Sequence, residues 1–422
     1  MRVYKFGGAS ILTPTRMQAL LPIITTAEQP ILMVVSAMGK TTNALEEIVA
    51  TACHGNKHEA HQLVLLLEQK HLDYAKDLLK PAYYIGAAAQ LNIHFTELQW
   101  AVDDAHGSKY DYSYDQIVCI GELLSTLIFS FYLKQEGYVH EWMDIRDVIR
   151  TDETFRDAKV DIAYSQRRAE HIIGRQLNAG KSVLTQGFIG ATVDNASVTL
   201  GREGSDYTAA LLGAMLDAKD VTIWKDVEGL LNADPKQFPN TVKIEAITYH
   251  EVIEMAYYGA QVIHPKTIKP LQNNNIPLYV KCFLNKELKG TVIQNEVKDA
   301  VYPPLIVWKE NQVLLQVTTR DFAFITEDYL SYIYRIFDKL HIKINMIQNA
   351  AISFVACVDK KEDKLQELIH ELGKHYRVLR NENMGLLTIR HYTPEILAEL
   401  TKGKQIFLEQ KTRNTVQVLV KA

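Results

Sequence analysis

Cysteine is scarce in this sequence, and positive charge is not in excess. The four cysteines, Cys53, Cys119, Cys282 and Cys357, are far apart and form no C-x-x-C pair, which argues against a disulfide framework and against a zinc ribbon. Acidic residues outnumber Lys and Arg by 50 to 46, so the formal net charge of −4 gives no basic surface for nucleic acid or an anionic membrane. We therefore expect a protein of a reducing compartment, the cytoplasm, without a nucleic-acid partner.

Long apolar runs and several common catalytic motifs are also absent. No apolar stretch approaches the roughly 18 residues that a membrane span needs, and Met1-Arg2 leads straight into a strand-like segment, so we expect neither a membrane partner nor a signal peptide. No G-x-G-x-x-G follows a strand and no G-x-S-x-G occurs, which is evidence against a hydride-transfer cofactor and against acyl transfer. Residues 39–41, Gly-Lys-Thr, would belong to a P-loop only if glycine stood in place of Val34.

Length and composition indicate a soluble protein of more than one domain. The chain has 422 residues, of which 47% are hydrophobic and 23% charged, and a single hydrophobic core rarely grows to that size. Strand-like runs alternate with helical ones as far as residue 293, which predicts an α/β domain with a mainly parallel sheet flanked by helices. We place the domain boundary in the polar segment before Pro303-Pro304, which gives domains 1–297 and 298–422.

The C-terminal part has a different pattern. Strands predicted at 313–317, 342–347, 352–358 and 376–379, with two helices between them, give the ferredoxin-like order βαββαβ. A second copy begins with a strand at 386–390, continues with a helix after Pro394 and strands at 405–408 and 415–420, and stops after βαββ. A truncated copy with unpaired strand edges favours a homodimer joined through this region.

Two glycine turns are typical of anion-binding sites. Lys5 ends a strand-like run, and Gly7-Gly8 follows it with a backbone that can approach an anion closely. The second turn, residues 201–204, leads into a helix for which Ser205 or Asp206 is a suitable N-cap, and a helix N-terminus attracts phosphate or carboxylate. Each turn also has a purely structural interpretation, as an edge-strand lysine before a turn or as a capped, glycine-broken turn.

Polar side chains from distant segments would meet if the strands are parallel, because parallel strands end at the same edge of a sheet. They are Lys5, Ser36 with Thr42, Arg202 with Asp206, and Glu122 at the start of an apolar helix. Two cations and two anions in one place fit phosphoryl transfer to a small zwitterion. The helix dipole alone also favours a carboxylate in the first turn, so a structural interpretation of Glu122 stays open. The histidines between residues 54 and 106 have no metal-ligand spacing, and we expect them at the surface.

Several segments resemble the motifs of the aspartate kinases, a family within the amino-acid kinase superfamily. The matches lie in the family's order over residues 3–267, which is more specific than any single motif. They are Lys5-Phe-Gly-Gly-Ala-Ser10 (family K-F-G-G-T-S), Val34-Val-Ser-Ala37 with Thr42-Asn43, Gly121-Glu-Leu-Leu-Ser125 (G-E-x-x-S), Gly201-Arg-Glu-Gly-Ser-Asp-Tyr-Thr-Ala209 (G-R-G-G-S-D-x-T-A), Trp224-Lys-Asp-Val-Glu-Gly229 with Ala233-Asp-Pro235, and Gly259-Ala-Gln-Val-Ile-His-Pro265 (G-A-K-V-L-H-P).

The resemblance implies a role for each matching residue in the ATP-dependent phosphorylation of L-aspartate. Lys5 would neutralise the transferring γ-phosphoryl group, and Asp206 would orient Lys5 and the substrate. The residues implied to bind L-aspartate are Ser36, Thr42, Glu122, Arg202 and Ser205; those implied to bind ATP are Lys5, Gly7, Gly8, Ser10, Lys225, Asp226, Asp234, Lys236 and Lys266. The β-carboxylate is already a nucleophile at neutral pH, so no general base is required, and Mg²⁺ would travel with ATP without a protein metal site.

Four positions depart from the family pattern. Ala9 and Lys225 replace threonines, Glu203 replaces a glycine, and Gln261 replaces a lysine expected near the nucleotide. Our hypothesis is that a cation has moved from position 261 to 225 or 266. Glu203 adds a negative charge beside a turn that should bind an anion.

The C-terminal region resembles the paired ACT domains of aspartate kinases, which implies regulation by an end-product amino acid such as lysine or threonine. Residues 344–351 lack the acidic effector segment that family members often carry, so the effector cannot be read from the sequence. Two alternatives remain for the whole chain. One is another amino-acid kinase, acting on glutamate, acetylglutamate, carbamate or UMP, and the other is an inactive amino-acid sensor.

Overall fold

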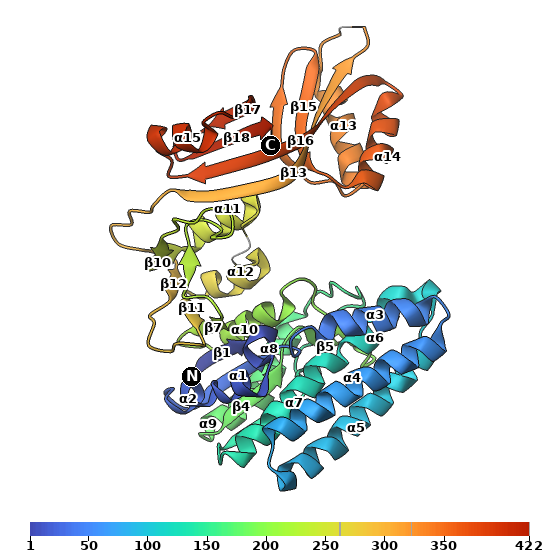
Figure 1. The fold of residues 1–422 in the computed structure, drawn as a ribbon, viewed down its shortest axis with the longest axis vertical. Helices are drawn as coiled ribbons and strands as arrows, with labels where there is room; N and C mark the ends of the chain where they lie inside the picture. The colour runs from blue at the N-terminus through green and yellow to red at the C-terminus, as the bar shows by residue number, and fades with distance from the viewer. Residues whose placement is uncertain (261–262, 322, 422) are drawn as a thin grey trace. The chain divides into compact units, whose positions relative to one another are not determined.

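The chain packs into two compact units (Figure 1). The computed structural model describes residues 1–260, 263–321 and 323–421. Unit 1 comprises Met1–Leu230, Lys243–Ile253 and Val262–Asp299, and unit 2 comprises Leu231–Val242, Glu254–Gln261 and Ala300–Ala422. Two short segments before residue 297 thus pack with the C-terminal part, and the predicted boundary between residues 297 and 298 stays a prediction.

Unit 1 is built on an eight-stranded sheet with the order β10-β12-β11-β7-β1-β2-β4-β3. Neighbouring strands are parallel except β11 and β12, which confirms the predicted α/β architecture. All five residues of β2 are buried, as expected of a parallel strand covered on both faces. The strands are β1 (Arg2–Phe6), β2 (Ile31–Val35), β3 (His140–Met143), β4 (Ser182–Gln186), β7 (Val221–Lys225), β10 (Ala246–Thr248), β11 (Leu278–Cys282) and β12 (Thr291–Gln294); the short strands β5 (Ile189–Ala191) and β6 (Ser197–Thr199) pair separately, and β8 (Leu230–Leu231) and β9 (Lys243–Ile244) form a further small sheet.

Helices surround this sheet, and the two long helices predicted within residues 57–106 are confirmed as α4 and α5. They pack against each other, and α5 also packs against α7. The helices are α1 (Pro14–Gln18), α2 (Leu21–Thr25), α3 (Thr41–Cys53), α4 (Lys57–Leu78), α5 (Pro81–Asp104), α6 (Tyr110–Val118), α7 (Ile120–Gln135), α8 (Ile162–Ala169), α9 (Arg175–Asn178), α10 (Gly204–Met215), α11 (Tyr249–Tyr258) and α12 (Pro265–Asn273).

Two expectations need correction: that no apolar stretch is long enough to span a membrane, and that the histidines between residues 54 and 106 lie at the surface. Among the described residues, one helical stretch, Gly107–Gln135, is long and apolar enough to cross a membrane, and 89% of its most apolar window is buried inside the protein. His71 is also buried, whereas we expected the histidines between residues 54 and 106, which lack metal-ligand spacing, at the surface. Its ring packs edge-on against Phe95, and burial lowers its pKa to about 4, so it is a neutral core residue.

Unit 2 contains a six-stranded sheet with the order β14-β15-β13-β16-β18-β17. The predicted βαββαβ order is confirmed by β13 (Leu305–Thr319), α13 (Glu327–Lys339), β14 (Ile344–Asn349), β15 (Ser353–Asp359), α14 (Glu362–Gly373) and β16 (Tyr376–Arg390), followed by α15 (Pro394–Thr401), β17 (Ile406–Lys411) and β18 (Thr415–Lys421). The separate strands predicted at 376–379 and 386–390 are one strand, β16. It pairs with β13 from Leu305↔Arg390 to Thr319↔Tyr376, and register shifts near Gln312 absorb the polar segment between the two apolar runs.

Candidate active site

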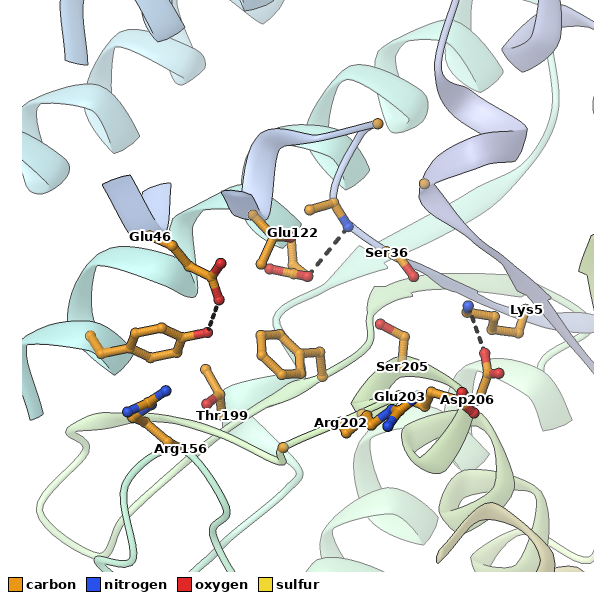
Figure 2. A pocket seen from close by; sticks show the side chains of 18 of the residues that line it. Lys5, Ser36, Glu46, Glu122, Arg156, Thr199, Arg202, Glu203, Ser205 and Asp206 are labelled. Carbon is orange, nitrogen blue, oxygen red and sulfur yellow. Dashed lines mark hydrogen bonds and ion pairs between the residues drawn. The ribbon is translucent and has the colours of Figure 1, made fainter. Parts of the chain in front are cut away.

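A polar cavity of about 710 Å³ lies at the carboxyl ends of β1 and β2 and at the N-terminus of α10, entirely within unit 1. Figure 2 shows Lys5 and Asp206 facing each other on one side of it, Ser36 and Ser205 between, and Glu46 and Arg156 on the other side. The polar side chains that follow these strands therefore lie around one cavity, as expected, because β7, β1 and β2 are adjacent parallel strands.

Lys5 and Asp206 form a buried ion pair. The Lys5 Nζ lies 2.6 Å from the Asp206 Oδ1, and the two residues are only 9% and 4% exposed. Lys5 belongs to β1, which lies between β7 and β2, so the alternative of an edge-strand lysine is wrong. Asp206 lies in the first turn of α10, where the helix dipole also favours its negative charge. Because both groups are buried, water and salt screen the attraction between the two charges only weakly.

The glycine turn after β1 packs against the loop that follows β2. A Cβ atom on Gly8 would lie 2.6 Å from the carbonyl oxygen of Ala37, so only glycine fits there. The backbone N–H of Gly39 donates to the carbonyl of Gly8 at 3.1 Å. Ser10 is buried and its hydroxyl donates to the carbonyl of Gly7 at 2.6 Å, so Ser10 shapes the turn. Gly8 lines the cavity itself.

Glu122 points into the cavity from the first turn of α7 and is 3% exposed. Its Oε1 accepts a hydrogen bond from the Ala37 N–H at 3.3 Å, whereas its Oε2 is buried and has no partner among the described residues. Burial raises the pKa of Glu122 to about 8. A buried carboxylate oxygen without a donor is costly unless a ligand supplies one. The helix dipole alone does not explain this oxygen, so the observation favours a binding role for Glu122.

The turn before α10 differs from the prediction. The N-cap of α10 is Glu203, in the left-handed conformation with φ 55°, and the helix begins at Gly204. Ser205 and Asp206 are therefore first-turn residues, and the prediction that one of them caps the helix is wrong. A Cβ on Gly187 would come within 2.6 Å of Ser205, so the end of β4 packs directly against this turn.

Arg202 is exposed, unlike Lys5, Glu122 and Asp206 of the same cavity, which are buried. It lines the cavity, and within the described part of the chain its guanidinium has no hydrogen-bond or ion-pair partner. Ser36, Thr42 and Ser205 line the same cavity. The structure thus brings together Lys5, Gly8, Ser36, Thr42, Glu122, Arg202, Ser205 and Asp206.

The residues predicted for the nucleotide are more dispersed. Lys225, at the end of β7, lines the cavity, and Asp226 follows it in an exposed position. Lys266, in the first turn of α12, forms an ion pair with Asp157 and lines a separate cavity of about 610 Å³. Asp234 and Lys236 belong to unit 2, where the Asp234 Oδ1 accepts from the Lys236 N–H at 2.9 Å. Gln261 lies outside the described residues.

Sequence reasoning missed one wall of the cavity. The guanidinium of Arg156 lies 4.6 Å from the centre of the Tyr114 ring, and the Tyr114 hydroxyl donates to Glu46 at 2.7 Å. Arg156 has φ 69°, and the Oδ2 of buried Asp115 accepts its backbone N–H at 2.9 Å. These residues come from separate segments and share no motif, so no local signal marks them.

No protein-held metal site accompanies the cavity in the described residues, where no group of three or more His, Cys, Asp or Glu side chains could hold an ion. Two of the carboxylates that line the cavity are paired within the chain: Asp206 with Lys5 and Glu46 with Tyr114.

Comparisons with known proteins agree with this geometry. The family model described as the amino acid kinase family matches residues 1–282. Lysine-sensitive aspartokinase 3 of Escherichia coli (strain K12) is 31% identical over 419 residues, which are 96% of this chain and 90% of that protein. The bifunctional aspartokinase/homoserine dehydrogenase 2 of Zea mays is 33% identical over 295 residues, or 69% of this chain, and only 32% of that longer protein is covered.

Solved structures give the same result. The crystal structure of Escherichia coli aspartokinase III with aspartate and ADP (R-state) matches with a TM-score of 0.83 and 28% identity, covering 100% of this chain and 96% of that one. The complex of the same enzyme with lysine and aspartate (T-state) matches with a TM-score of 0.84 and 27% identity, at the same coverage. The chain therefore belongs to the amino acid kinase family and, within it, to the aspartokinases.

Proposed function

We propose that this chain is an aspartate kinase, which transfers the γ-phosphoryl group of ATP to the β-carboxylate of L-aspartate and releases ADP and 4-phospho-L-aspartate. This is the first step towards lysine, threonine and methionine. The observation that carries the proposal is the set of charges in one cavity: a buried Lys5–Asp206 pair and, within the residues that the structure describes, an Arg202 without a partner and a Glu122 oxygen without a donor. Together they complement a zwitterion with a second carboxylate beside a phosphoryl group.

Each charge has a task in this reaction. Arg202 binds the α-carboxylate, and the unpartnered Oε2 of Glu122 accepts the ammonium group. Ser36, Thr42 and Ser205 offer hydroxyl groups to the amino acid. Lys5, oriented by Asp206, neutralises charge on the γ-phosphoryl oxygens as the β-carboxylate attacks phosphorus and the bond to the ADP oxygen breaks. No proton is removed from the nucleophile, so the chain supplies position and electrostatics only.

The nucleotide side is assigned to residues around the end of β7. Lys225 lines the cavity, and in this proposal it, rather than Lys266, takes the place of the lysine expected at position 261. Gly7 and Gly8 offer backbone amides to the phosphates, with Ser10 supporting their turn. We keep Asp226, Asp234 and Lys236 as further nucleotide contacts in this proposal, with Mg²⁺ bound to the ATP phosphates. Lys266 is a weaker candidate, because it is paired with Asp157 beside a separate cavity.

The remaining proposals concern the rest of the chain. We assign residues 1–297 to a catalytic domain and residues 298–422 to a regulatory domain that binds lysine or threonine. Support comes from the relative named lysine-sensitive aspartokinase 3 and from the lysine complex of aspartokinase III. A homodimer joined through the C-terminal region, in the cytoplasm, completes the proposal.

Two alternatives are less well supported. A kinase for a longer acceptor would share Lys5 and the glycine turn, and an inactive sensor would keep the amino-acid pocket. The sensor is disfavoured by the buried Lys5–Asp206 pair, because an ammonium group desolvated at this depth has no use in binding aspartate alone.

A direct assay separates these possibilities. Purified full-length chain is given Mg²⁺ and ATP with L-aspartate, L-glutamate, acetylglutamate, carbamate or UMP in turn, and ADP release is recorded. Aspartyl phosphate is trapped with hydroxylamine as the hydroxamate. We expect turnover with L-aspartate; turnover with another acceptor only, or none at all while aspartate still binds, would overturn the proposal.

A further inference from the structure

Glu203 stands where the resemblance to the family leads us to expect glycine, and the backbone there has kept the conformation that glycine prefers. Its φ is 55°, in the left-handed region that side chains with a Cβ rarely adopt. The carboxylate also lies beside a turn that should attract anions. Both features are unfavourable on their own, so the side chain needs another reason to be there.

The contacts of Glu203 join two helices. Its Oε2 accepts a hydrogen bond from the backbone N–H of His264 at 2.9 Å, and His264 is the N-cap of α12. Its backbone carbonyl accepts from the N–H groups of Asp206 at 3.0 Å and Tyr207 at 3.1 Å, in the first turn of α10. The carboxylate therefore interacts with the positive end of α12 and not with the anion-binding end of α10.

A second contact links the other end of the same turn to α12. Lys266, two residues after His264, forms an ion pair with Asp157. Asp157 in turn packs against Gly201, where a Cβ would come within 2.5 Å of its Oδ1. The turn 201–203 is thus hydrogen-bonded to the start of α12 at Glu203, and at Gly201 it lies against Asp157, which is ion-paired with Lys266 of α12; Arg202 stands between these two contacts in the sequence.

We propose that Glu203 is a positioning residue for the phosphoryl transfer: its carboxylate fixes the turn 201–203 to α12 and so sets the places of Arg202 and Asp206. This inference rests on the proposed kinase activity. The competing explanation is electrostatic, namely that Glu203 repels the triphosphate. The charged or titratable groups around it are Arg202, His264, Lys266 and Asp157, and the direct partner is a backbone N–H, which favours a hydrogen-bonding role.

Two substitutions at Glu203 separate the explanations. E203Q keeps an oxygen acceptor and a side chain on the left-handed backbone but removes the charge. E203G removes the acceptor and also the strain that a Cβ causes in the left-handed conformation. D217G is the matched control, because Asp217 is also left-handed, with φ 48°, and follows the other end of α10. For each variant we would measure kcat and KM for both substrates together with the melting temperature.

We expect E203G to lose about tenfold in kcat with an unchanged or higher melting temperature, and E203Q to restore most of the loss. D217G should gain stability without losing kcat. A residue with a merely structural role would lower the melting temperature together with the activity. The proposal is overturned if E203G keeps wild-type kcat, or if both variants share a lowered KM for ATP, which is the result expected of repulsion.

Hydrogen exchange makes the test independent of the chemistry. Amides 204–208 of full-length E203G should exchange faster than those of E203Q and of D217G, whatever reaction the chain catalyses. Faster exchange in a chain that shows no aspartate-dependent ADP release would reject the proposed function and keep the link between Glu203 and α12. Unchanged exchange in an active enzyme would reject this link and keep the function.

Discussion

Two clusters of charged residues, one in each unit, differ in how completely they are paired. Around the cavity of unit 1, the Glu122 Oε2 has no donor and Arg202 has no acceptor among the described residues. In unit 2, the Asp359 Oδ1 accepts from Lys309 at 3.2 Å, Gln312 at 2.9 Å and Asn345 at 2.8 Å. The first cluster has polar groups left for a ligand, and the second has satisfied its own.

The pKa values of the two carboxyl groups reflect the same difference. Burial raises the pKa of Glu122 to about 8, since few donors compensate for the lost water. Burial acts in the same direction on Asp359, but hydrogen bonds from Gln312 and Asn345 and the charge of Lys309 outweigh it and lower the pKa. An unsatisfied charge is therefore a better guide to a binding site than the number of charges in a cluster.

The largest effect should follow from Lys5→Ala. We expect kcat with aspartate and ATP to fall about 10³-fold or more, because the cation that neutralises the transferring group is lost. ADP release and hydroxamate formation measure it. Asp206 would remain buried without its partner, so a lower melting temperature is also expected. Lys5→Arg, which keeps the charge, is the control, and an Ala variant within tenfold of wild type would remove Lys5 from the mechanism.

The two arginines that line the cavity give the next largest contrast. Arg202→Ala should raise KM for aspartate about 100-fold without a change in melting temperature, because the side chain is exposed and has no partner to lose among the residues with described structure. Arg156→Ala should change KM less than about threefold, since its charge is already paired with Asp111 at 3.0 Å. Steady-state kinetics of both variants test this. Equal effects on KM would mean that pairing in the free chain does not predict ligand binding.

Part of this contrast could be predicted from the sequence. Lys5, Gly8, Ser36, Thr42, Glu122, Arg202, Ser205 and Asp206 all line the cavity or form its central ion pair, because each stands at a strand end or a helix start, where parallel topology brings segments together. The parallel sheet and the βαββαβ order could be predicted from the hydrophobic periodicity of the sequence.

The remainder depends on contacts that no local pattern records. Arg156 reaches the cavity because Asp115, 41 residues earlier, accepts its backbone N–H. The N-cap of α10 is Glu203, in the left-handed conformation, although Ser205 and Asp206 are better caps by residue type. Strand β16 continues through a polar segment because β13 pairs with it on both sides of the irregularity. Tertiary pairing decided each of these against the local preference.

Substitution of Glu122 should make the unsatisfied carboxylate visible through pH. In wild type, kcat/KM for aspartate should rise with pH through about 8, because only the ionised carboxylate binds the ammonium group. Glu122→Gln should abolish this rise and increase KM about thirtyfold at pH 8. A pH profile of the Gln variant that still rises through about 8 would assign the titration to another group.

The same group should make stability depend on pH. The folded-state pKa of Glu122 is raised from 4.5 to about 8, so the folded chain holds a proton that the unfolded chain releases. The free energy of unfolding should therefore decrease as the pH rises through that window, and Glu122→Gln should be more stable than wild type by at least about 1 kcal/mol near pH 8. Urea unfolding at pH 5 and pH 8 gives the comparison.

A smaller effect separates the two lysines considered as replacements for the missing cation at position 261. Lys225→Ala should raise KM for ATP about tenfold, because Lys225 lines the cavity. Lys266→Ala should change it less than about twofold, since Lys266 is paired with Asp157 beside a different cavity. Unchanged KM in both variants would reject the hypothesis that the cation has been relocated.

The smallest effect on catalysis should come from unit 2. Gln312 is 2% exposed; it donates to Asp359 at 2.9 Å and accepts from Asn345 at 2.8 Å, so it is central to the satisfied cluster. Gln312→Met keeps the volume and removes the hydrogen bonds, and it should lower the free energy of unfolding by about 1–3 kcal/mol. Without an effector, kcat and KM should equal those of wild type. A Met variant of wild-type stability would show that these hydrogen bonds contribute no net stability. The two clusters would then differ in the arrangement of their hydrogen bonds but not in the stability that these bonds provide.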